Sequence, residues 1–366
     1  MLKRMISLYL LCCMLLILLC GCKKNPNKHN TAPTVPPEFT NTMVAVSVPT
    51  TVETTKAHNG TTLFEYTYQS ISLVLHRPTV ADKIIADFTK RVSSTRKNAD
   101  VIKDKAKKTY NGSINWIPYL CHVTYSPARI DHRVLSLFGN NVVYTGGNHP
   151  DFTCMSANYD MSTGNILTLS SLLTAGATAD TLRDLTLEVL AEMTEGDYLY
   201  ENYAVIVNQR FNTDPRTDEN WYFSQSGLCF YFAPYEIAPY TSGVITAEIP
   251  YEKLTGLLRP EYFPVDRPRA QGSVSLSPLA DVNLDQFSDI AELVTDDKAD
   301  MHIIYTEGNV QDIRISVKDK YSQYIVFAVY NLSANDGIVI RATNEVLSKM
   351  KIHYRSSDGT VTTPLT

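Results

Sequence analysis

The chain has 366 residues, 44% of them hydrophobic, and a formal net charge of -5 at pH 7. This length exceeds the usual size of one domain, so it predicts two or three folded modules with tails. The mildly acidic balance and the lack of a basic stripe exclude nucleic acid as an expected partner.

The first 22 residues have the order of an export signal. A short basic start precedes an apolar run from Met5 to Leu19, and the tetrapeptide "LCGC" ends at Cys22. This order is typical of secretory signals, and the tetrapeptide resembles the bacterial lipobox, whose final cysteine is lipidated. We therefore predict a signal peptide over residues 1–21, a lipid anchor on Cys22 and a location on the extracytoplasmic face of the bacterial membrane. An uncleaved membrane anchor is the alternative, because the run is nearly long enough to span.

Residues 22–60 are rich in threonine, proline, asparagine and lysine and show no periodicity. Such a segment buries too little apolar surface to offset the entropy of ordering. We therefore expect a flexible tether between the membrane and the folded part.

Three cysteines remain after the signal peptide and the lipidated position: Cys121, Cys154 and Cys229. An odd number permits at most one internal disulfide. Their spacing matches no metal motif, so we interpret them mostly as small buried apolar side chains.

The folded part is expected to begin near Thr61 with a strand, "FEYTYQSISLVL". A helix over residues 79–92 follows, with Thr79 as its N-cap and one apolar face. Strands are predicted over 114–127 and 133–147, and two more helices over 180–193 and 200–211. Helices alternating with mostly antiparallel strands indicate an α+β fold with a mainly antiparallel sheet and packed helices.

The stretch from Tyr144 to Leu169 contains His149 between a glycine pair and Pro150. The glycines permit a bend and the proline favours an extended residue before it. A strand and the turn "DMSTGN" then complete a hairpin. The alternative interpretation makes His149 and Asp151 an acid/base pair.

A second unusual stretch runs from Gly227 to Leu254. Its strand "GLCFYF" alternates as a half-buried strand does, and two prolines then frame a loop that contains Tyr235, Glu236 and Tyr240. Rings held on a rigid loop are good contact residues. Alternatively, one or both tyrosines pack inward and bond a backbone carbonyl.

These two stretches, "VLSLFGNNVVYTGGNHPDFTCMSANYDMSTGNILTLSSLL" and "FYFAPYEIAPYTSGVITAEIPYEKL", resemble the RsiV-type domain of lysozyme-sensing anti-sigma factors. The preceding region is similar to the non-catalytic N-terminal module of PdaC-type peptidoglycan deacetylases. The resemblance implies a PdaC-like module over 61–145 and an RsiV-like module over 146–264. Asn148 departs from the alanine that usually precedes the family's histidine.

After a linker over 265–278, residues 279–366 read as short strands rich in β-branched and aromatic residues, separated by turns. Short strands at this spacing favour a C-terminal all-β, sandwich-like domain. Its expected role is that of an interaction or spacer domain.

No nucleophile elbow, zinc-protease motif, phosphate loop or dinucleotide fingerprint occurs. We therefore expect no enzyme activity, no cofactor and no metal; a metal held by His122, His132 and His149 is the alternative. Only four residues precede the apolar run, so we do not expect the cytoplasmic sigma-binding segment of RsiV-like proteins.

The resemblance implies a binding module for a lysozyme-like protein or a cell-wall glycan. The candidate contact residues are Tyr144, His149, Tyr235, Glu236 and Tyr240. The alternatives are a cell-envelope enzyme that acts on peptidoglycan and a structural envelope lipoprotein without a dedicated ligand.

Overall fold

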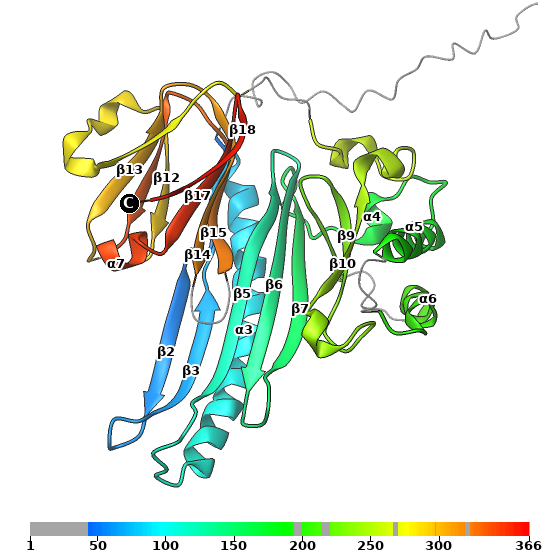
Figure 1. The fold of residues 1–366 in the computed structure, drawn as a ribbon. Coiled ribbons are helices and arrows are strands. Elements are labelled where there is room, and N and C mark those ends of the chain that lie inside the picture. The colour runs from blue at the N-terminus through cyan, green and yellow to red at the C-terminus, as the bar shows by residue number, and fades with distance from the viewer. Residues whose placement is uncertain are drawn as a thin grey trace, which may run out of the picture. The chain divides into compact units, whose positions relative to one another are not determined.

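In the computed structural model, the loop that carries His149 joins two strands of a five-stranded sheet (Figure 1). The structure describes residues 43–193, 199–213, 220–265, 270–296, 298–318 and 323–365, all within one compact unit. The order is β2-β3-β5-β6-β7, and only β3 and β5 pair in parallel. The strands are β2 (Thr50–Lys56), β3 (Thr62–Gln69), β5 (Tyr119–Ile130), β6 (Val134–Tyr144) and β7 (Asp151–Asp160).

One face of this sheet packs against the long helix α3 (Pro78–Thr109) (Figure 1). The predicted apolar face is confirmed, with Ile84 and Phe88 fully buried. The predicted cap and end are wrong: Arg77 precedes the helix and proline occupies its first turn, where its missing N–H costs nothing. The helix continues past residue 92 because no glycine or proline follows and the stripe is extended by Ala99, Ile102 and Ala106.

The C-terminal part is a sandwich of a six-stranded and a four-stranded sheet, which confirms the predicted all-β architecture. Apolar side chains from both sheets form a single core, including Ile304, Ile338, Phe327 and Ile352. The six-stranded sheet runs β18 (Gly359–Pro364), β17 (Met350–Ser356), β14 (Val310–Lys318), β15 (Gln323–Leu332), β1 (Ala45–Ser47) and β4 (Ser72–Val74). The four-stranded sheet runs β11 (Val274–Pro278), β13 (Met301–Thr306), β16 (Asp336–Arg341) and β12 (Asp289–Val294). The short helix α7 (Asn344–Leu347) joins β16 to β17.

The second half of the expected tether is ordered, contrary to the sequence prediction for residues 22–60. β1 lies between β15 and β4 and pairs antiparallel with both, and Val44 and Val46 are buried. β2 forms a hairpin with β3. The prediction was wrong because it rested on the polar composition of the whole segment. That segment contains a short apolar run, "MVAVSV", which is long enough for one buried strand.

The expected domain boundaries also differ from the structure. The division at 145/146 falls in the turn of the β6–β7 hairpin, whose strands pair along ten residues. The two expected modules therefore share one sheet. β11 lies within the expected linker over 265–278, and β1 and β4 belong to the same sheet as the C-terminal strands.

A smaller α+β layer adjoins β7. Its three-stranded sheet, β10-β9-β8, packs with short helices around Trp221, Phe223, Phe230 and Phe232. A capping box begins the first helix, because the Thr168 hydroxyl accepts from the Ser171 amide and the Ser171 hydroxyl accepts from the Thr168 amide. These elements are α4 (Leu169–Leu172), α5 (Ala179–Glu192), α6 (Tyr203–Thr213), β8 (Trp221–Phe223), β9 (Gly227–Phe232) and β10 (Ile245–Pro250).

The mixed α+β class with mainly antiparallel sheets is thus confirmed. Within the described residues, no helix has the length and apolar character needed to cross a membrane. The predicted signal peptide and Cys22 lie outside the described residues.

Candidate functional site

The two stretches that the sequence singled out meet in space. The His149 ring, in the loop between β6 and β7, stacks on the Tyr240 ring with centroids 4.3 Å apart and planes at 27°. The Tyr235 ring lies 5.9 Å from His149 and 5.4 Å from Tyr240. We call these three side chains the aromatic cluster. It brings together residues that are almost ninety positions apart in the chain.

Hydrogen bonds fix the rings of the aromatic cluster. His149 Nδ1 donates to the Pro150 carbonyl oxygen at 3.1 Å, since that oxygen can only accept. In the neutral imidazole, Nε2 is then the acceptor, and the Tyr235 hydroxyl lies 3.2 Å from it. The Tyr240 hydroxyl donates to the same Pro150 oxygen at 3.1 Å. One alternative from the sequence was that a tyrosine of this loop bonds a backbone carbonyl. Tyr240 does so, and its ring also stacks on His149.

Tyr235 has an unusual backbone conformation. Its φ is +71°, in the left-handed region that costs an L-residue about 1–2 kcal/mol. The turn holds it there through the Tyr235 amide on the Ala238 carbonyl and the Glu236 amide on the Ala233 carbonyl, both at 3.0 Å. The ring remains 56% exposed. Residues in such sparsely populated backbone regions cluster at functional sites.

Glu236 anchors the loop and does not join the aromatic cluster. Its Oε1 accepts from Arg210 Nη1 at 2.9 Å, and its Oε2 accepts from the Ala233 amide at 2.9 Å. The buried Arg210 guanidinium also lies 4.6 Å above the Phe232 ring. Both carboxylate oxygens are therefore used in positioning Tyr235.

Tyr144 braces the other loop. Its hydroxyl donates to the Gly147 carbonyl at 3.1 Å, which closes the turn that carries His149. Gly146 and Gly147 both have positive φ, as the bend predicted from the sequence requires. Tyr144 is half-buried at the end of β6, and within the described part of the chain its ring makes no stacking contact with the aromatic cluster.

Comparison with known proteins bears on the second loop. A family model described as "Protein of unknown function (DUF3298)" matches residues 171–252. The chain carries a DUF3298 domain. The matched segment contains α5, α6, β8 to β10 and the loop with Tyr235 and Tyr240, whereas His149 precedes it.

Two solved structures of DUF3298 proteins are similar to this chain. One, from Bacteroides fragilis, is 19% identical and covers 58% of this chain and 92% of its own, with a TM-score of 0.41. The other, from Pseudomonas aeruginosa, is 16% identical and covers 60% and 97%, with a TM-score of 0.43. No curated protein matches the chain.

A second aromatic group borders the β6–β7 loop and was missed by the sequence analysis. Trp116 stacks on Tyr119 with centroids 5.1 Å apart, and a methyl group at Gly146 would lie 3.8 Å from the Tyr119 hydroxyl oxygen. Beside them, Ile114 is 98% exposed and Ile117 is 62% exposed. The sequence analysis placed residues 114–118 in a strand, whereas the structure has a loop there. β5 starts only at residue 119, because the proline before it cannot donate to the ladder.

The three histidines proposed as a metal site do not converge. His122 packs edge-on against Tyr324, His132 against Tyr330, and His149 lies in the aromatic cluster. Among the described residues, no group of three histidine, cysteine or acidic side chains is placed to hold a metal ion. Both ring nitrogens of His149 have partners other than Asp151.

All three cysteines are free thiols. Cys121 and Cys229 are buried, as predicted, and Cys154 on β7 is half-buried beside the Glu236 and Arg210 pair of the DUF3298 domain. Burial raises the pKa of Cys121 to about 11 and those of Cys154 and Cys229 to about 12.

These shifted thiols predict a loss of stability at alkaline pH. The folded state binds the thiol protons more tightly than the unfolded state, so the stabilisation is complete below pH 9 and is lost as the pH rises towards 12. We expect urea unfolding midpoints to fall over this range, and to fall less in a Cys229→Ala variant. If the unfolding midpoint fell equally steeply with pH in the wild type and in Cys229→Ala, the buried thiol of Cys229 would not be a cause of the loss.

Proposed function

We propose that this chain is a non-catalytic binding module of the bacterial cell envelope, whose aromatic cluster contacts a protein or cell-wall glycan ligand. The observation that carries the proposal is the half-exposed Tyr235 ring, held in a strained conformation against His149. Strained backbone conformations of this kind cluster at active sites and ligand clamps. Rigid tyrosines provide contact area with little loss of side-chain entropy on binding.

The proposed surface extends beyond the aromatic cluster. Lys105 donates to Thr145 at 3.3 Å, so the end of α3 contacts the loop that carries His149. Ile114 and Ile117 add exposed apolar side chains next to this contact. In Figure 1, the C-terminal end of α3 and the β6–β7 turn lie at the same end of the five-stranded sheet. An apolar patch with aromatic anchors suits a protein partner, in which a few such residues supply most of the affinity.

The choice of partner rests on the resemblance to RsiV-type and PdaC-type modules. It supports a lysozyme-like protein as the first candidate and peptidoglycan as the second. Lipid attachment through Cys22 would place the module on the extracytoplasmic face of the membrane, where both partners occur.

Retention of the protein on immobilised lysozyme and on purified peptidoglycan tests the proposal. We expect the soluble part, from residue 43 onward, to be retained by one of the two, and Tyr240→Ala to reduce the affinity at least about tenfold. A matched control is Tyr305→Ala, a half-buried tyrosine on β13 of the C-terminal sandwich. Absence of retention on both supports, or equal losses for the two variants, would overturn the proposal.

The Tyr235→Gly variant distinguishes a role of this side chain in ligand binding from a role in the stability of the fold. Glycine adopts positive φ without strain, so we expect this variant to unfold no more easily than the wild type while its retention falls. A variant that unfolds more easily and binds normally would show that the strain serves packing instead. Muropeptide turnover that is abolished by His149→Ala would favour the alternative, an envelope enzyme.

A further inference from the structure

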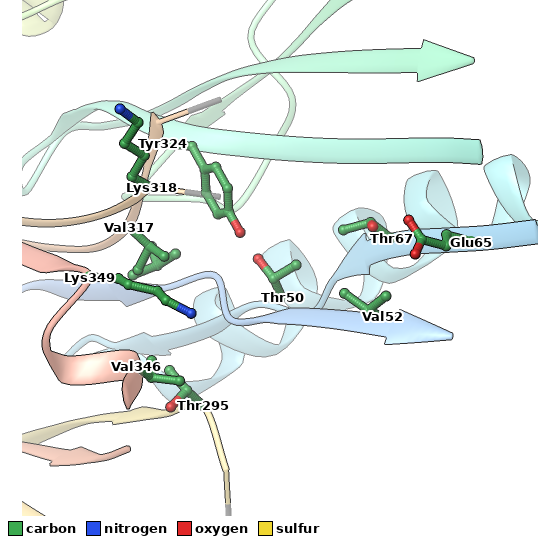
Figure 2. Close-up of a pocket in the computed structure, with 11 residues that line it drawn as sticks. Thr50, Val52, Glu65, Thr67, Thr295, Val317, Lys318, Tyr324, Val346 and Lys349 are labelled. Atoms are coloured by element: carbon green, nitrogen blue, oxygen red, sulfur yellow. The ribbon is translucent and has the colours of Figure 1, made fainter. Parts of the chain in front are cut away.

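A cavity of about 580 Å³ lies on the other side of the β2–β3 hairpin from α3 (Figure 2). Its floor is one face of the hairpin, formed by Thr50 and Val52 on β2 and Glu65 and Thr67 on β3. Val52 and Thr67 are directly opposite in the register. The volume is within the range of small-molecule sites, about 300–1,000 Å³.

The cavity exists because the five-stranded sheet is covered unequally on its two faces. On the first face, α3 contacts β3, with the Tyr66 hydroxyl 2.9 Å from the Thr95 hydroxyl. On the second face, β15 covers β5, and the Ile325 amide donates to the Ser126 hydroxyl at 3.1 Å. The outer two strands on this side, β2 and β3, extend beyond the part of the sheet that β15 covers. Val52 is consequently 58% exposed although it faces the cavity.

The walls of the cavity are largely apolar. Val317 and Val326, from β14 and β15, and Val346, from α7, line it together with the Tyr324 ring. The buried His122 ring contacts the Tyr324 ring edge-on, with centroids 6.4 Å apart. This contact holds the tyrosine in place as a fixed wall. An apolar ligand body would remove these surfaces and Val52 from water, which favours binding.

Polar groups gather at one end of the cavity. In Figure 2, the Lys349 ammonium and the hydroxyl groups of Thr50 and Tyr324 point into the same space, whereas the Lys318 ammonium points away from it. Lys349 also donates to Glu345 at 2.7 Å. Both partners of this ion pair are exposed, so it is weak and can be exchanged for a ligand.

This arrangement identifies the ligand by its chemistry. One ammonium and two hydroxyl groups match a single carboxylate, which accepts several hydrogen bonds from such donors. The cavity offers no arginine fork for a bidentate phosphate contact among its lining residues.

The geometry points to a binding site for a small molecule with an apolar body and one carboxylate, seated between the β2–β3 hairpin and the C-terminal sandwich. The carboxylate contacts Lys349, Thr50 and Tyr324, and the apolar body contacts Val52 and the wall valines. This site is separate from the aromatic cluster, so its assignment does not depend on the proposed function.

Octanoate is a suitable probe for this site, with octylamine of equal chain length as its cationic counterpart. Titration calorimetry of the soluble chain should show octanoate binding at one site, with octylamine at least tenfold weaker. We expect Lys349→Gln to weaken octanoate at least tenfold and Val52→Thr, which keeps the shape but adds a hydroxyl, to weaken it severalfold. Lys351→Gln, an exposed lysine on β17, is the matched control and should bind normally.

Absence of octanoate binding would overturn the inference. It would also be overturned if octylamine bound as tightly, or if Lys349→Gln and Lys351→Gln had the same affinity. Since both lysines are exposed, neither variant should impair folding, and thermal unfolding of each checks this. Retention on lysozyme or peptidoglycan should not change in any of these variants.

Discussion

Arg129→Met is expected to destabilise the protein by about 3–5 kcal/mol, because it leaves a buried carboxylate without its partner. The Arg129 side chain is almost fully buried, and its Nε donates to Asp131 at 2.7 Å. Its Nη1 donates to the Tyr251 hydroxyl at 2.7 Å and the Tyr262 carbonyl at 2.6 Å. The guanidinium thus joins β5 to the end of the DUF3298 domain and to the segment that follows it.

Asp131 has a second function in the same network. Its Oδ1 accepts from the amides of Arg133 and Val134 at 2.7 and 2.8 Å, which shapes the turn between β5 and β6. Urea unfolding measures the predicted loss. Arg183→Met is the matched control, since its partners Asp180 and Asp184 are largely exposed, and should change the stability by no more than about 1 kcal/mol. Similar losses for the two variants would contradict the importance of the buried network.

A chain that begins at residue 50 is expected to lose cooperative folding, whereas one that begins at residue 43 should unfold like the longer protein. The difference is β1, which fills the gap between β15 and β4. Its loss exposes the edge of β15 and the apolar side chains that pack on it. Thermal unfolding, followed by circular dichroism, distinguishes the two chains.

A single substitution makes the same test without truncation. Val46 is fully buried, so Val46→Asp places a carboxylate in the core and should cost at least about 3 kcal/mol. Val52→Asp is the control, since this valine is also in the N-terminal segment but is 58% exposed. Equal stability of the two variants would show that β1 does not hold the sheet together.

Periodic and local features were the predictable part of this fold. The apolar stripe of α3 and the bend around Gly146 and Gly147 were inferred from neighbouring residues. The half-buried alternation expected for β9 is wrong, because all six of its residues are buried. The stripe and the bend arise from the geometry of the backbone itself. The class of the fold follows from them.

Features that depend on distant partners were not predictable in the same way. β1 has three residues and becomes a strand only because β15 and β4 lie on both sides of it. The stacking of His149 on Tyr240 depends on how the DUF3298 domain packs beside β7, which no local pattern encodes. Glu236 was selected with its loop neighbours, but its pairing with Arg210 on α6 gives it a positioning role.

Hydrogen–deuterium exchange of the soluble chain, with and without the retained ligand, tests the central proposal most directly. We expect protection to appear in residues 144–150 and 233–243, the two loops that carry the aromatic cluster, and in the neighbouring loop over 111–118. We expect no change along β17 and β18 of the C-terminal sandwich. Protection confined to the sandwich, with none in the two loops, would contradict the proposal that the aromatic cluster is the binding surface.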